Sequence, residues 1–202
     1  DTGTPMARVS RAATLGALRR PAVKQAIGIA AVAQGVMVFL MIPTPIAMIA
    51  CGFGDAAASD VIRWHIVAMF APSFFTGFLI TRFGAEVIAT VGLCTIVTSA
   101  VGASLGISEV HFYGSLIVLG IGWNFAFISA TTLLDAAVTD AEKAAVQGFN
   151  DTFVAFISTV CAFAAGFIVA DFGWFTLTLI SAGVGMLALV VTVYYRPQPI
   201  HS

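Results

Sequence analysis

Charged residues are scarce in this chain: only 9% of its 202 residues are Asp, Glu, Lys or Arg, against 59% hydrophobic residues. A soluble domain of this length could not hide so much apolar surface in one core. We expect no nucleic-acid partner, and the net charge of −1 is uninformative, because in a membrane protein the position of each charge along the chain matters more than the total. The composition therefore predicts an integral membrane protein, whose first partner is the lipid bilayer.

Thiols and titratable clusters are also few. The three cysteines, Cys51, Cys94 and Cys161, lie in apolar runs without metal-ligand spacing or a disulfide pattern, so we interpret them as packing residues. No apolar run carries two histidines at ligand spacing, no serine or cysteine has a base within reach by sequence, and no glycine loop follows a strand. We therefore expect no enzyme activity, no cofactor and no metal site.

Long apolar runs dominate what is present, and each is long enough to cross a bilayer. The six runs are Val23 to Cys51, Val61 to Phe83, Ala85 to Leu105, Val110 to Val138, Ala144 to Ala170, and Trp174 to Tyr195. They predict an all-α membrane protein, a six-transmembrane-helix bundle over residues 23–196. Pro43 and Pro45 predict a kink or unwound turn in the first span, and Gly114, Gly120 and Gly122 predict soft points in the fourth.

The basic residues predict the orientation of the bundle. Residues 1–22 are expected to form a basic cytosolic linker or tail, cut from the middle of a longer polypeptide, and residues 197–202 a cytosolic C-terminal tail. With six spans, both termini and eight of the nine Lys and Arg residues fall on the cytosolic side, as the positive-inside bias requires. Only Arg63 falls outside, where its side chain can snorkel to the headgroups.

The loop GFLITRFG, between the second and third spans, carries a family resemblance. Gly77, Arg82 and Gly84 match the second copy of the signature loop of the major facilitator superfamily (MFS), although Thr81 stands where that loop has an acidic residue and the basic residues after the second glycine are missing. Together with six short-looped spans and a basic leader, this loop makes the chain resemble the C-terminal half of an MFS transporter.

Three further stretches are similar to a bacterial permease branch of that superfamily: Trp64 to Gly77, Gly120 to Phe125, and Lys143 to Asp151. A looser resemblance to bacterial riboflavin carriers does not name the substrate. The resemblance implies a secondary transporter in the bacterial inner membrane, moving a small organic solute by alternating access, with the proton as a possible coupling ion. It also implies a partner, either the missing N-terminal six-helix half or a second copy. The alternative is a non-transporting membrane scaffold or receptor derived from a carrier.

Four residues are candidates for the solute cavity: Gln34, His65, Trp123 and Asn124. Asn124 offers a donor and an acceptor near the middle of the fourth span, and the neighbouring Trp123 offers a flat apolar face for an aromatic solute. Gln34 has the same chemistry in the first span. For both amides the competing interpretation is an interhelical hydrogen bond.

The remaining candidates are titratable or lie next to a titratable group. His65 could couple transport to protons, or could simply be hydrogen-bonded. Asn150 and Asp151 could bind a proton or a cation, or could hold the cytosolic end of the fifth span against the missing half. The Asp151 carboxylate inside a membrane span costs about 2.5 to 3.5 kcal/mol unless it is paired, protonated or hydrated. The charged loop from Asp135 to Lys143 is expected to cap helix ends or to meet Arg82.

Overall fold

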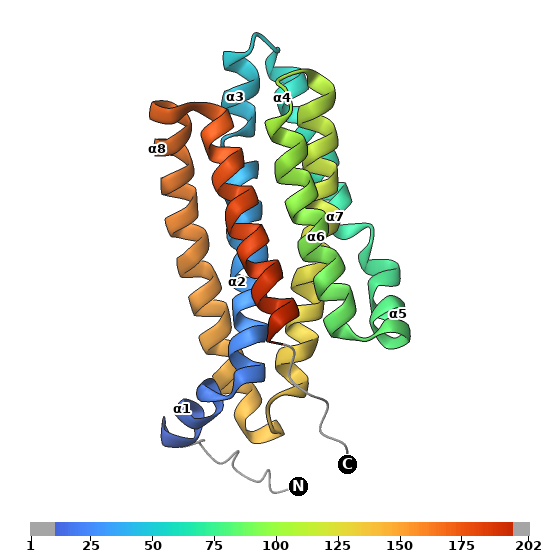
Figure 1. Cartoon of the computed structure of the whole chain (residues 1–202), viewed down its shortest axis with the longest axis vertical. Helices are drawn as coiled ribbons and strands as arrows, with labels where there is room; N and C mark the ends of the chain where they lie inside the picture. The colour runs from blue at the N-terminus through green and yellow to red at the C-terminus, as the bar shows by residue number, and fades with distance from the viewer. Residues whose placement is uncertain (1–10, 196–202) are drawn as a thin grey trace, which may run out of the picture.

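The computed structural model describes residues 11–195, and within that range the regular structure is α-helical (Figure 1). Its elements are α1 (Arg11–Arg19), α2 (Pro21–Met41), α3 (Thr44–Ala50), α4 (Asp55–Phe70), α5 (Ser73–Phe83), α6 (Ala85–Ser104), α7 (Glu109–Ala136) and α8 (Asp140–Tyr194). The first ten residues of the predicted leader, with Arg8, and the predicted C-terminal tail lie outside the described residues, as does Arg196.

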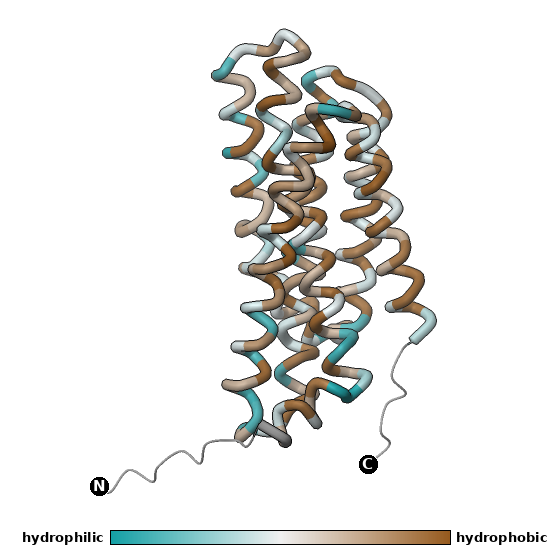
Figure 2. The backbone as a smooth tube through the Cα atoms, turned by 90° about the vertical axis from the view of Figure 1, so that its left-hand side faces the viewer, coloured by the Kyte–Doolittle hydropathy of each residue, from teal (hydrophilic) through white to brown (hydrophobic). Residues whose placement is uncertain are grey.

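The helices form six antiparallel passes. Five helical segments are long and apolar enough to cross a membrane, and the longest, the 55-residue α8, contains two passes. At Gly173 its backbone adopts a φ of +80°, which reverses the chain, so that the two arms of α8 run in opposite directions (Figure 1). Apolar residues predominate along the helices, and hydrophilic ones are commoner toward the ends (Figure 2). The predicted all-α membrane bundle is confirmed.

Prolines break the first two passes. The break predicted at Pro43 and Pro45 is confirmed, because α2 ends at Met41 and α3 begins at Thr44 after a two-residue turn. The second pass was expected to be continuous from Val61, but its helix begins six residues earlier and is interrupted before Pro72. Proline has no N–H to donate to the preceding turn, so α5 restarts there.

The prediction of soft points in the fourth pass was wrong. Helix α7 is unbroken over 28 residues. Gly120 and Gly122 are sites of close helix packing instead, whereas Gly114 faces open space. A Cβ atom on Gly122 would lie 2.8 Å from the backbone nitrogen of Ile96 on α6, and one on Gly120 would lie 2.8 Å from the carbonyl oxygen of His65 on α4. Small residues let helices approach when lipid offers no hydrophobic drive for association.

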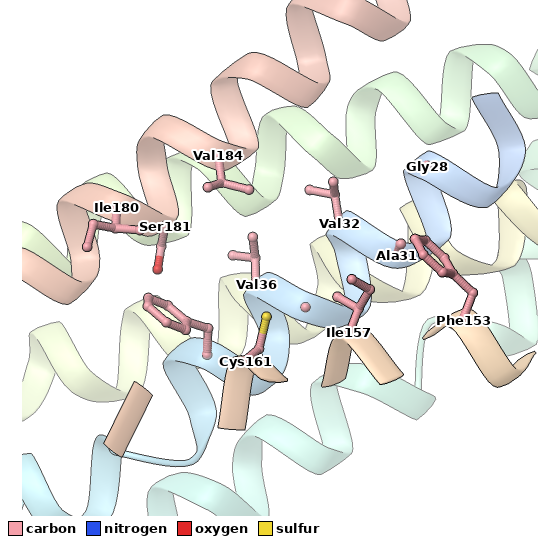
Figure 3. A pocket seen from close by; sticks show the side chains of 12 residues that line it. Gly28, Ala31, Val32, Val36, Phe153, Ile157, Cys161, Ile180, Ser181 and Val184 are labelled. Carbon is pink, nitrogen blue, oxygen red and sulfur yellow. The ribbon is translucent and has the colours of Figure 1, made fainter. Parts of the chain in front are cut away.

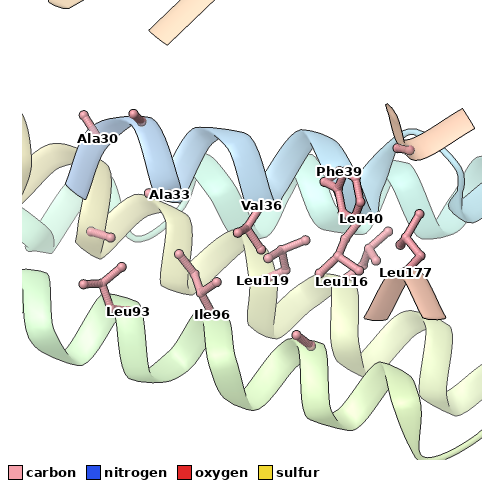
Figure 4. Close-up of a cluster of buried hydrophobic side chains, with 14 of the residues drawn as sticks. Ala30, Ala33, Val36, Phe39, Leu40, Leu93, Ile96, Leu116, Leu119 and Leu177 are labelled. Atoms are coloured by element: carbon pink, nitrogen blue, oxygen red, sulfur yellow. The ribbon is translucent and has the colours of Figure 1, made fainter. Parts of the chain in front are cut away.

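The main core lies where α7 meets α2 and α6. Its fully buried side chains include Leu93, Ile96, Leu116, Leu119 and Leu177 (Figure 4). A smaller apolar cluster joins α1, α2, α7 and α8 at the end of the bundle where the described chain begins, with Ala17 and Val23 among its members. The sequence did not predict α1, which packs on α8 through this cluster.

Candidate functional site

Gln34 of α2 and Trp123 of α7 link these two helices through their side chains. The indole Nε1 of Trp123 donates a hydrogen bond of 2.8 Å to Gln34 Oε1. The Trp123 ring stacks on Phe127, with centroids 5.0 Å apart and planes 13° apart, and it meets Phe70 of α4 edge-on at 6.4 Å. Trp123, Gln34 and Phe127 are half-buried, and Phe70 is exposed. We call these four residues the Trp123 shelf.

The shelf combines a flat apolar face with a polar edge. Stacked aromatic rings favour a planar apolar partner. The Gln34 amide oxygen is used by Trp123, whereas no acceptor for its amide nitrogen is found among the described residues. That nitrogen can donate to a carbonyl oxygen or ring nitrogen of a solute. The arrangement therefore suits a flat heteroaromatic molecule with acceptor atoms on its edge.

Asn124 follows Trp123 in sequence but faces another helix. It is fully buried, and its Nδ2 donates to the carbonyl oxygen of Met69 and to Ser73 Oγ, both at 2.7 Å. Its Oδ1 accepts a hydrogen bond of 2.6 Å from Thr76 Oγ1. Since these partners flank the α4–α5 break, Asn124 ties that break to α7. Its contacts are those of an interhelical hydrogen bond, and the structure does not bring it onto the shelf.

His65 is likewise enclosed between helices. Its ring is fully buried, and Nδ1 lies 2.7 Å from the carbonyl oxygen of Leu116 on α7. Because a carbonyl can only accept, Nδ1 carries the proton in this contact, and Nε2 has no partner in the described part of the protein. Nearby, Arg63 pairs with Asp60 at 2.7 Å.

Asn150 and Asp151 adjoin each other on the first arm of α8 but differ in exposure. Asn150 is buried, donates to Asp151 Oδ1 at 3.2 Å, and has an Oδ1 atom with no partner within residues 11–195. Asp151 is exposed on the surface of the single chain. A carboxylate on a membrane helix is costly to expose to lipid, so this face requires water or protein against it.

The signature-loop residues occupy three different settings. Gly84 forms the turn between α5 and α6 with a φ of +88°, a conformation that favours glycine. Gly77 lies inside α5 and faces open space. Arg82 is exposed, and its guanidinium carbon lies 5.5 Å from the ring centroid of Phe83.

The charged loop between α7 and α8 caps a helix, as expected. Thr139 and Glu142 form a reciprocal capping box at the start of α8, and Lys143 pairs with Asp135 at 3.0 Å and with Asp140 at 3.3 Å. The distant partner of Glu142 is Arg20, not the Arg82 considered from the sequence.

Sequence reasoning missed part of the shelf. Phe127 lies four residues after Trp123, so helical spacing could have placed the two rings on one face. Phe70 comes from another helix and carried no such signal. Over residues 11–195, no group of three or more metal-ligating side chains is found.

No protein-family model matches the chain. Over 191 residues it is 42% identical to the riboflavin transporter RfnT of Brucella anthropi, an alignment that covers 94% of this chain and 46% of that protein. It is 34% identical over 165 residues to YdeG and 29% identical over 187 residues to YddS, two uncharacterized MFS-type transporters of Bacillus subtilis. These alignments cover 81% and 89% of this chain, but 38% and 43% of the relatives. The chain therefore spans less than half the length of each relative.

Proposed function

This chain is a homologue of MFS transporters, as its signature loop indicated, and on that premise we propose that it forms the C-terminal half of a secondary transporter. In this proposal the transporter moves a small organic solute by alternating access. Two six-helix bundles rock about a solute site near the middle of the membrane, and each bundle contributes one wall of the cavity. The six antiparallel passes of this chain supply one such bundle.

The observation that carries the proposal is the contact between Gln34 and Trp123. It joins the first and fourth passes through partly exposed side chains, and we propose that these two passes line the cavity. A single hydrogen bond between two helices can open and close again as the helices rock. A solute bound on the Trp123 shelf would therefore compete with this contact or stabilise it in one state.

The proposed solute class is a planar heteroaromatic molecule, of which riboflavin is the first candidate. The stacked pair of Trp123 and Phe127 offers a face for a fused ring system, and the Gln34 amide nitrogen offers a donor for its carbonyl edge. The name of the Brucella relative, riboflavin transporter RfnT, agrees with this chemistry.

The proposed partner is a second six-helix bundle, either an N-terminal half or another copy of this chain. Asp151, exposed on the first arm of α8, supports such a partner, because its carboxylate needs a polar neighbour. We place the assembly in the bacterial inner membrane with both termini cytosolic, on the distribution of basic residues.

Uptake of radiolabelled riboflavin by vesicles that contain the complete transporter tests the proposal. Trp123→Ala removes the ring and its hydrogen bond. We expect the uptake rate at low solute concentration to fall about three- to tenfold, which corresponds to the binding free energy of one lost aromatic contact. Gln34→Ala should also slow uptake. Trp64→Phe is the matched control, because Trp64 is exposed on α4 and outside the shelf.

Two results would contradict the proposal. Normal uptake by Trp123→Ala at normal abundance would remove the shelf from the solute path. If the unaltered transporter moves riboflavin in neither direction, riboflavin is not its solute. If it also fails to transport a panel of other heteroaromatic solutes, the solute class is refuted and the scaffold or receptor interpretation is favoured.

A further inference from the structure

A long groove runs between α2 and the two arms of α8. It consists of two adjoining cavities of about 380 and 750 Å³, which share Gly28, Val32 and Val184 and are therefore continuous. Figure 3 shows the side chains of the smaller cavity, with Val32 and Val36 of α2 between Ile157 on one arm of α8 and Val184 on the other. We call it the α2–α8 groove.

The groove is separate from the Trp123 shelf. No shelf residue lines either cavity. On α2 the lining residues of the smaller cavity, among them Gly28, Ala31 and Gly35, recur at helical spacing along one face. Gln34 comes six residues after Gly28 and is therefore rotated from it by about 120° around the helix axis. The groove consequently opens on a different side of α2 from the proposed solute site.

The chemistry of the groove changes along its length. The smaller cavity is apolar, and the hydroxyl of Ser181, its one hydroxyl group, is already donated to the carbonyl oxygen of Leu177 at 2.9 Å. The larger cavity extends to the end of the bundle where α2 begins, and there it is lined by Lys24, Tyr194 and Tyr195. Lys24 is exposed and makes no ion pair with any described residue.

We propose that the α2–α8 groove binds one anionic phospholipid from the leaflet at this end of the bundle. An acyl chain fills the apolar part, between α2 and the arms of α8, and the phosphate group lies at Lys24 Nζ. Tyr194 and Tyr195 border the headgroup, at the level where amphipathic aromatic rings are stable in a membrane.

Charge and shape both favour a lipid over a protein helix as the occupant. A basic side chain at the mouth of a crevice between membrane helices is the arrangement that binds anionic headgroups. Each cavity lies within the range of about 300 to 1,000 Å³ that is usual for small-molecule sites. The apolar part offers no unpaired polar group in its described lining that a neutral polar ligand would need.

Native mass spectrometry of the intact transporter tests the proposal, with phosphatidylglycerol and phosphatidylcholine of equal chain length as probes. We expect phosphatidylglycerol to bind preferentially, and Lys24→Gln to weaken its binding about fivefold, the effect of losing one basic contact with an anionic headgroup. Arg19→Gln is the matched control, because Arg19 is exposed at the same end of the bundle but does not line the groove.

A second variant tests the apolar part. A Cβ atom on Gly28 would meet no atom within 4 Å, so Gly28→Leu can fill the groove without disturbing the helix packing. We expect it to reduce the binding of both lipids, whereas Gly114→Leu, at an equally open site outside the groove, should leave binding unchanged.

Three outcomes would overturn the proposal. The first is equal retention of both lipids by the unaltered protein. The second is unchanged phosphatidylglycerol binding in Lys24→Gln, a surface substitution that should leave the fold intact. The third is a change in subunit number in Gly28→Leu, which would show that the groove holds another polypeptide.

Discussion

Arg20 and Glu142, 122 positions apart in sequence, form a two-pronged ion pair that fastens the start of α2 to the start of α8. Arg20 Nη2 lies 2.8 Å from Glu142 Oε1, and Nη1 lies 3.0 Å from Oε2. The same guanidinium donates to the carbonyl oxygen of Ala137 at 3.1 Å, at the end of α7. Bidentate pairs of this kind have a defined geometry. One side chain therefore holds three helix ends together.

The first prediction concerns the pH dependence of this contact. Glu142 lies in the first turn of α8, before the apolar run that starts at Ala144. The pKa of its carboxyl is lowered first by the Thr139 backbone N–H and then by hydrogen bonds from Arg20 and the Thr139 hydroxyl. A lowered folded-state pKa adds stability above the unfolded-state pKa, about 4.3 for a glutamate, and this stability is lost as the pH falls through the folded-state value.

Thermal unfolding in detergent at a series of pH values checks this pH dependence. Glu142→Gln should unfold at a lower temperature than the unaltered protein near neutral pH, and the difference should disappear in acid. Asp140→Asn, at a side chain that is 98% exposed, is the control and should change little. A difference that persists unchanged into acid would show that the carboxylate charge does not act here.

A second prediction addresses Asn124. Asn124→Ala removes three hydrogen bonds to the α4–α5 break, and at about 0.6 kcal/mol for each interhelical bond it should destabilise the fold by about 2 kcal/mol. Thr76→Val removes only one of these bonds and should cost about a third as much. Unfolding in mixed micelles measures both values. Equal costs would mean that the hydrogen bonds do not account for the effect.

Close packing of α7 against α6 leads to a third prediction. Gly122→Ala places a methyl group within 2.8 Å of the Ile96 backbone and should destabilise the bundle by about 1 to 3 kcal/mol, the usual cost of overpacking. Gly114→Ala, on the same helix with open space around it, is the control. Equilibrium unfolding compares the two. If Gly122→Ala were as stable as Gly114→Ala, the helices would not be in contact at this point.

The fourth prediction tests the proposed role of Asp151. Asp151→Asn removes the charge from the first arm of α8 and should slow solute uptake by the complete transporter, while abundance and membrane insertion stay normal because asparagine is no costlier to insert. Asp171→Asn, near the chain reversal at Gly173, is the control. Uptake by Asp151→Asn that matches the unaltered protein at every pH tested would exclude a role for the carboxylate.

Local features were predictable from the sequence, and contacts between distant residues were not. Pro43 and Pro45 marked the break between α2 and α3 because proline acts on its own backbone turn. Gly120 and Gly122 were misjudged as soft points, since their role depends on α4 and α6 lying against α7. The partner of Glu142 could not be found for the same reason, although its capping role could, because the capping box is local.

The sequence by itself determined that the chain resides in a membrane, how many times it crosses and where prolines break its helices, because hydrophobicity and backbone chemistry act over short stretches. Only the tertiary structure decided which polar side chains meet. Trp123 and Asn124 are neighbours, yet Trp123 turns to Gln34 and Asn124 to Ser73, since consecutive residues on a helix point about 100° apart. The rotation of each helix within the bundle selects those partners, and it is set by packing across the whole fold.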